Sequence, residues 1–156
     1  MKKIKNPFLS REDYQCFGCS PKNHLGLQMK FSDEGEYVVC EWEPRPEFQG
    51  YNNVLHGGIQ ATLMDEIASW TIYVKAGTGG VTSRMETKYK RPVYTDRGTL
   101  TLKAKIKHTV RRIVTVEVQL FDHDSRLCSF GEVDYFTMSE EEAIKKLLYP
   151  GKEAFR

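Results

Sequence analysis

Two kinds of hydrophobic pattern divide the chain, one with a helical period and one with a strand period. The helical pattern runs from Ile59 to about Lys75. Its apolar positions include Ile59, Leu63, Ile67, Trp70 and Val74. Because other apolar residues occupy the remaining faces, we expect this helix to be buried on nearly all sides. Gly77 is expected to end it.

Alternating apolar and polar residues predict strands on both sides of this helix. They cover residues 27–31, 38–42, 81–90, 100–107, 114–120 and 127–138. Short turns between the last three favour hairpins. A polar helix is expected from Ser139 to Leu148, since Ser139 and Glu142 form a capping box. One buried helix with five or six strands predicts an α+β fold, in which a curled antiparallel sheet wraps around the helix.

Length and composition narrow the class of protein. The 156 residues fit a single domain, with its core at about 16–138, and 40% are hydrophobic. The net charge of +2 does not favour nucleic acid as a partner. No apolar stretch is long enough to cross a bilayer, and none follows the basic start of the chain. We therefore expect a cytoplasmic protein with no membrane segment and no signal peptide.

The four cysteines offer one candidate metal or redox motif. Cys16 and Cys19 form a C-x-x-C pair, which can be half of a zinc site or a redox pair. A structural zinc site needs two more ligands, usually closely spaced, whereas Cys40 and Cys128 each stand alone. The only nearby imidazole is His24. We therefore expect two reduced loop cysteines, no metal and no cofactor.

An acidic residue within the apolar helix is the first candidate for chemistry. Asp65 follows Met64 and lies close to Ile67, so its carboxylate is expected to be desolvated and more basic than an exposed one. Glu66 is adjacent but points about 100 degrees away around the helix. The alternative is that both acids lie on a solvated stripe of the helix.

The sequence His56-Gly57-Gly58 at the start of the helix is the second candidate. Glycines let a substrate approach the backbone, and the first N–H groups of a helix are free to donate to a carbonyl oxygen that gains charge. The alternative is a plain turn in which His56 bonds to the backbone. Gly57 and Asp65 are separated by about 12 Å along the helix. A site that needs both is therefore expected to form between antiparallel helices of two subunits.

Three segments of the chain carry a family resemblance. They are FQGYNNVLHGGIQATLMDE (48–66), VTSRMETKYKRPV (81–93) and CFGCSPKNHLGLQMKF (16–31). They resemble hotdog-fold acyl-CoA thioesterases of the 4-hydroxybenzoyl-CoA thioesterase superfamily, in the branch of the phenylacetate-pathway enzyme. The most specific element is HGG with an acid nine residues after the histidine. The resemblance implies hydrolysis of an acyl-CoA thioester by a homodimer at least, and we expect a homotetramer.

The resemblance also implies roles for residues around the helix start. Asp65 matches the catalytic carboxylate, acting as general base or as nucleophile. Gly57 matches the glycine whose N–H polarises the thioester carbonyl, and His56 matches a positioning residue beside it. Relatives often hold Asn or Gln six or seven residues before this histidine. Here Gly50 and Gln49 occupy those positions, so Gln49 is the candidate and its register stays open.

A hydroxyl group in the following strand is expected to orient the attacking water. Thr82 matches the family residue, but strand parity places Ser83, not Thr82, with Met85 and Tyr89. Ser83 therefore remains a rival. The candidates for substrate binding are Gly58, Ser83, Glu66, Lys90, Arg91 and Arg112.

The basic candidates are expected to bind the phosphates of coenzyme A, because the guanidinium group of arginine can donate two hydrogen bonds to one phosphate. The alternative is that these basic residues protect strand edges from aggregation.

Two other functions stay open. One is a non-catalytic acyl-CoA-binding module. The other is a hydratase or dehydratase of acyl thioesters, which would pair an acid with a histidine, and neither His108 nor His123 lies in such a motif.

Overall fold

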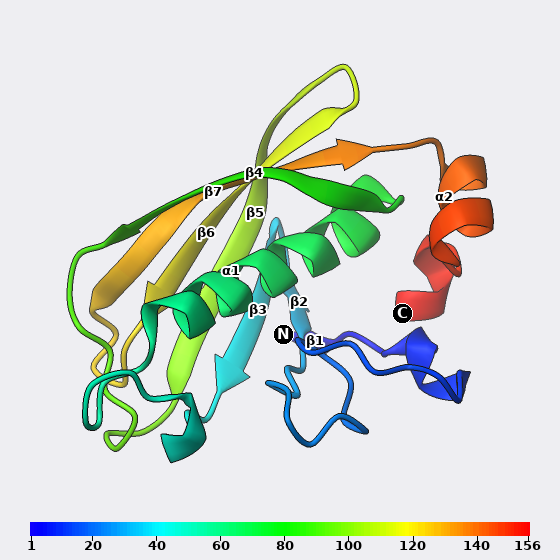
Figure 1. Cartoon of the computed structure of the whole chain (residues 1–156). Coiled ribbons are helices and arrows are strands. Elements are labelled where there is room, and N and C mark those ends of the chain that lie inside the picture. Colours follow the sequence, from blue (N-terminus) through cyan, green and yellow to red (C-terminus); the bar gives the residue numbers. More distant parts are fainter.

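A computed structural model, which describes all 156 residues, contains one antiparallel sheet curled around a long helix (Figure 1). The strands are β1 (Lys2–Lys3), β2 (Ser32–Glu34), β3 (Tyr37–Trp42), β4 (Gly80–Tyr89), β5 (Leu100–Val110), β6 (Ile113–Phe121) and β7 (Leu127–Thr137). Their order is β1-β2-β3-β5-β6-β7-β4, and every neighbouring pair is antiparallel. This confirms the expected α+β fold. The sheet has seven strands and not the expected five or six, because it includes β1 and β2, which are too short to show a period in the sequence.

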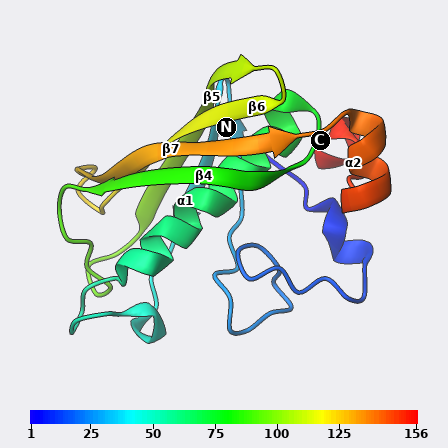
Figure 2. The same cartoon turned by 45° about the horizontal axis from the view of Figure 1, so that its top comes forward.

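The long helix α1 (Gly57–Thr71) runs along the concave face of the sheet, with β4 at the edge (Figure 2). It begins two residues earlier than the apolar period indicates, since His56 caps it by accepting from the Gly58 N–H. A π-helical turn, η3 (Ile72–Ala76), extends it to Gly77. Gly77 ends the helix as predicted, in the left-handed conformation with φ of 71°.

One predicted strand is wrong. Residues 27–31 form no strand, and Gln28 has a positive φ of 53° that interrupts an extended run. The N–H groups of Leu27 and Met29 bond to carbonyls of the 16–20 loop, at 2.7 and 2.9 Å. Alternate side chains are still buried, namely Leu27, Met29 and Phe31. The alternating pattern of residues 27–31 therefore reflects burial of one side of the segment and does not indicate pairing with another strand.

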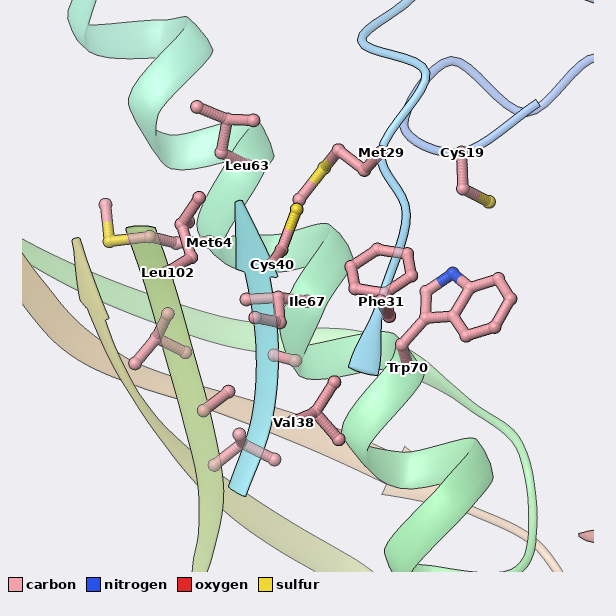
Figure 3. Packing of buried hydrophobic residues seen from close by; sticks show 14 of the residues in the cluster. Cys19, Met29, Phe31, Val38, Cys40, Leu63, Met64, Ile67, Trp70 and Leu102 are labelled. Atoms are coloured by element: carbon pink, nitrogen blue, oxygen red, sulfur yellow. The ribbon is translucent and has the colours of Figure 1, made fainter. Parts of the chain in front are cut away.

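An apolar core fills the space between α1 and the sheet. Figure 3 shows Ile67 between the helix and β3, and Met64 beside Leu102 of β5. Phe31 stacks on Trp70 with ring centroids 4.6 Å apart. The face of α1 that carries these residues is closed by the sheet, so chemistry on the helix is confined to its other faces.

The two ends of the chain pack together beside the helix. The predicted polar helix is confirmed as α2 (Glu140–Leu147), and the Ser139 hydroxyl accepts from the Glu142 N–H at 3.1 Å. A 3₁₀ turn, η4 (Lys152–Phe155), follows, and the Lys5 N–H donates to the Phe155 carbonyl at 3.0 Å. Two further 3₁₀ turns are η1 (Pro7–Ser10) and η2 (Pro46–Phe48). None of the helices combines the length and apolarity that crossing a membrane requires.

We expect Ile67→Ala to lower the free energy of unfolding by about 2–5 kcal/mol. The side chain of Ile67 has no exposed surface, so its truncation leaves a cavity in the core. Urea unfolding at one protein concentration measures the change. Ile144→Ala is the control, because Ile144 is 47% exposed on α2 and should shift stability by no more than about 0.5 kcal/mol. An equal loss of unfolding free energy in both variants would contradict the buried position of Ile67.

Candidate active site

Two hydroxyl groups hold the carboxylate of Asp65, which is partly buried in the middle of α1. Its Oδ1 accepts from the Thr82 hydroxyl at 2.9 Å and from the Tyr135 hydroxyl at 2.6 Å. Burial, followed by the charge of Asp65, raises the pKa of Tyr135, so its hydroxyl keeps its proton and donates it between Oδ1 and the backbone carbonyl of Asp65, which is also 2.6 Å away. Oδ2 makes no hydrogen bond within the chain. The carboxylate is thus oriented through one oxygen while the other stays free.

A β-bulge in β4 decides which hydroxyl reaches this carboxylate. Thr82 pairs with Tyr135, but the register then shifts before Arg84, so Ser83 is the extra residue. The Ser83 hydroxyl donates instead to the carbonyl of Asp134 at 3.1 Å. Strict parity, which favoured Ser83, fails at this single irregularity.

The residues at the start of α1 form a second group. His56 Nδ1 accepts from the Gly58 N–H at 2.9 Å, so a neutral imidazole carries its hydrogen on Nε2. The N–H of Gly57 has no hydrogen-bond partner in the chain, while its carbonyl accepts from the Tyr89 hydroxyl at 2.7 Å. The Gly57 N–H is therefore a free donor at the positive end of the helix dipole.

An open hollow of about 360 Å³ lies against this second group. It is lined by Glu47, Phe48, Gln49, His56, Gly58, Ile59 and Thr62. The side-chain oxygen of Gln49 accepts from the Asn53 N–H at 3.1 Å, which fixes the loop before the helix. Asp65 and Thr82 do not line the hollow. A single chain therefore carries the candidate residues as two groups, about 12 Å apart along α1.

The carboxylate of Glu66 is turned away from Asp65, toward the N-terminal loop. Its Oε1 lies 3.4 Å from Cys16 Sγ and accepts from Trp70 Nε1 at 3.2 Å. Burial raises the pKa of Glu66, and hydrogen bonds from Cys19, Cys16 and Trp70 oppose that rise. The structure therefore separates the two neighbouring acids into different environments.

The basic candidates lie at the two ends of the sheet. Lys90 and Arg91 follow β4 at its Tyr89 end, and the Arg91 guanidinium donates to a backbone carbonyl at 2.9 Å. Arg112 lies in the turn between β5 and β6, near the Gly80 end of β4, and its guanidinium is 3.8 Å from Glu142. The ten residues of β4 span about 33 Å. One phosphate cannot contact both sets in a single chain.

Tyr135 belongs to the candidate site but was not among the residues predicted from the sequence. It follows Val133 at the buried positions of β7, where alternation marks an inward face. A buried tyrosine needs a hydrogen-bond partner for its hydroxyl. That signal predicts some partner, but only the packing of α1 against β7 identifies Asp65.

Comparisons with known proteins identify the family to which the chain belongs. Residues 52–129, half of the chain, match the thioesterase superfamily. A putative esterase of Saccharolobus solfataricus is 21% identical over 108 residues, which cover 69% of this chain and 70% of that protein.

Solved structures share the fold. A thioesterase superfamily protein matches with a TM-score of 0.68 and 24% identity. The matched region covers 74% of this chain and only 57% of that protein. A Streptococcus mutans protein, solved with acetyl CoA, has a TM-score of 0.67 at 18% identity, covering 83% and 96% of the two chains. The chain has their hotdog fold and belongs to the thioesterase superfamily.

Proposed function

We propose that the chain hydrolyses acyl-CoA thioesters to a free carboxylic acid and coenzyme A, with Asp65 activating the attacking water. The observation that carries this proposal is the carboxylate held at Oδ1 by Thr82 and Tyr135, with Oδ2 free. Family membership supports thioester hydrolysis as the reaction. The acetyl CoA in the Streptococcus mutans structure supports an acyl-CoA substrate.

In the proposed reaction, Oδ2 of Asp65 takes a proton from water as the water attacks the acyl carbonyl. Thr82 and Tyr135 orient the carboxylate, so the base is positioned before substrate arrives. Collapse of the tetrahedral intermediate expels the thiolate of coenzyme A. Thiolate is a good leaving group, so the step needs no strong general acid.

The Gly57 N–H of a second subunit is the proposed donor to the carbonyl oxygen. Within one chain this donor and Asp65 are about 12 Å apart, too far to act on one carbonyl group. Antiparallel packing of two α1 helices would set the Gly57 of each opposite the Asp65 of the other. The unpaired edge of β4 and the partly exposed face of α1 are the surface offered to the second copy. A homodimer is thus the smallest active unit, and a homotetramer pairs two of them.

A panel of acyl-CoAs, assayed by release of free thiol, tests the proposed function. We expect turnover of at least one member, and the panel then identifies the preferred acyl group. Binding of acyl-CoA without turnover of any member would support a non-catalytic binding module instead. Addition of water to an enoyl-CoA in place of thiol release would support a hydratase.

We expect Tyr135→Phe to lower kcat by roughly tenfold or more, because a hydrogen bond to a charged group contributes about 1.5–3 kcal/mol. The variant keeps the ring in the core and removes only the hydroxyl that donates to Asp65. Tyr149→Phe is the matched control, since that hydroxyl donates to the Tyr73 carbonyl at 2.9 Å, away from Asp65. A similar loss of kcat in both variants would assign the effect to general destabilisation.

A further inference from the structure

Three polar side chains converge beneath the loop of residues 16–20. The Sγ atoms of Cys16 and Cys19 and one carboxylate oxygen of Glu66 all lie within 4.8 Å of one another. The bond lengths of tetrahedral zinc place two sulfur ligands about 3.8 Å apart, and a sulfur and an oxygen about 3.5 Å apart. The 3.4 Å between Cys16 Sγ and Glu66 Oε1 fits this spacing. The cluster is therefore compact enough for its three atoms to surround one cation.

Donors behind these atoms hold two of them in place. Trp70 Nε1 donates to Glu66 Oε1 at 3.2 Å. The hydroxyl of Tyr14 lies 2.7 Å from Cys19 Sγ, and because it accepts from the Asn6 amide at 3.1 Å, its hydrogen is free for the sulfur. Outer hydrogen bonds of this kind orient the ligands of metal sites. None of the ion pairs of the chain includes Glu66, so no side-chain cation balances the cluster.

The loop is fitted closely over the carboxylate. A Cβ at Gly18 would lie 2.3 Å from Glu66 Cδ, so only glycine permits this approach. The Ser20 N–H donates to the Cys16 carbonyl at 3.0 Å, and the Met29 N–H donates to the Gly18 carbonyl at 2.9 Å. Figure 3 shows Cys19 on this loop, beside Trp70 of α1. A hydrogen-bonded turn thus holds the two cysteines against Glu66.

We propose that Cys16, Cys19 and Glu66 bind one thiophilic divalent cation, for which zinc fits best. Two thiolates and a carboxylate supply three ligands, and Cys16 is only partly buried, so water can take the fourth position. No metal was expected here from the sequence, because a structural zinc site was taken to need two further ligands with close spacing of their own. Glu66 is 50 residues from Cys16 along the chain. The ion fastens the N-terminal loop to α1 at the residue next to Asp65.

Titration of the reduced, chelator-treated protein with cobalt and then zinc tests this site. We expect one cobalt ion per chain, with the charge-transfer absorption of cobalt–thiolate bonds, and displacement of cobalt by zinc. Zinc should also raise the Tm, because it binds the folded state. Cys16→Ser and Cys19→Ser should each weaken binding by at least tenfold and reduce the absorption. Glu66→Gln should weaken binding while the thiolate absorption remains.

Cys40→Ser and Cys128→Ser are the matched controls, because both cysteines are buried away from the cluster and should leave cobalt binding unchanged. Circular dichroism of each variant separates loss of a ligand from loss of the fold. Absence of stoichiometric cobalt binding by the folded, reduced protein would overturn the proposal. Equal cobalt binding by the Cys16→Ser variant would also overturn it. The same holds if thiol alkylation shows a Cys16–Cys19 disulfide in the purified protein and that protein takes up no metal once the disulfide is reduced.

Discussion

Asp65→Asn should lower kcat for acyl-CoA hydrolysis by on the order of a hundredfold or more, the loss expected for a general base. The amide keeps the size of the carboxylate and can still accept from Thr82 and Tyr135 through its oxygen. The atom that replaces Oδ2 is then a nitrogen whose lone pair is not available to take a proton. The substitution thus removes the proposed chemistry with little change in packing.

Thiol release at saturating substrate measures this effect, with the preferred acyl-CoA of the panel. Asp96→Asn is the control, because Asp96 is exposed in the loop before β5 and makes no hydrogen bond or ion pair through its side chain. The control should retain the activity of the unmodified chain. An Asp65→Asn variant that binds substrate and turns it over at the original rate would exclude this carboxylate from the mechanism.

The fold could be predicted where one period continues over many residues. The helix was predicted because its apolar residues recur with a helical period, and its end because Gly77 follows the last of them; a partly exposed face remains in the single chain, where burial on nearly all sides was expected. The two- and three-residue strands β1 and β2 leave no such pattern. Residues 27–31 alternate like a strand, yet their backbone bonds to a loop. Side-chain burial can be predicted from alternation, but the identity of the backbone partner cannot.

Likewise, only some residues of the candidate site could be predicted from the sequence. Asp65 and the free N–H of Gly57 follow from local sequence, since an acid within an apolar helix and a glycine at its first position are recognisable there. The choice of Thr82 over Ser83 depends on a bulge, which the period of a strand cannot indicate. Contacts between distant segments, such as Tyr135 of β7 with Asp65 of α1, depend on how the helix packs against the sheet, which local sequence does not indicate.

Gly57→Pro should lower kcat by about 10²–10³, the loss found when an oxyanion donor is removed. Proline removes the N–H that the proposal assigns to the thioester carbonyl. It is tolerated at the first position of a helix. His56 already has a polyproline II-like conformation, which a residue before proline favours, with φ of −57° and ψ of 134°. A Cβ at Gly57 would meet the Tyr89 ring at 3.6 Å, an ordinary contact.

Gly57→Ala is the matched control, because it adds the Cβ and keeps the N–H. We expect its kcat to stay within a few-fold of the original, since removing no donor leaves the oxyanion contact in place. An equal loss in the alanine variant would assign the effect to the added carbon. Full activity of the proline variant would exclude the Gly57 N–H as the donor.

Mixing the two inactive variants tests whether the site is shared. When Asp65→Asn and Gly57→Pro chains are refolded together in equal amounts, about half of the dimers are hybrids. Each hybrid has one site with both an intact Gly57 N–H and an intact Asp65, contributed by different chains, so about a quarter of all sites are active. Thiol release should therefore recover to about that fraction. If each site lay within one chain, every site would lack one of the two groups, and the mixture would stay as inactive as its components.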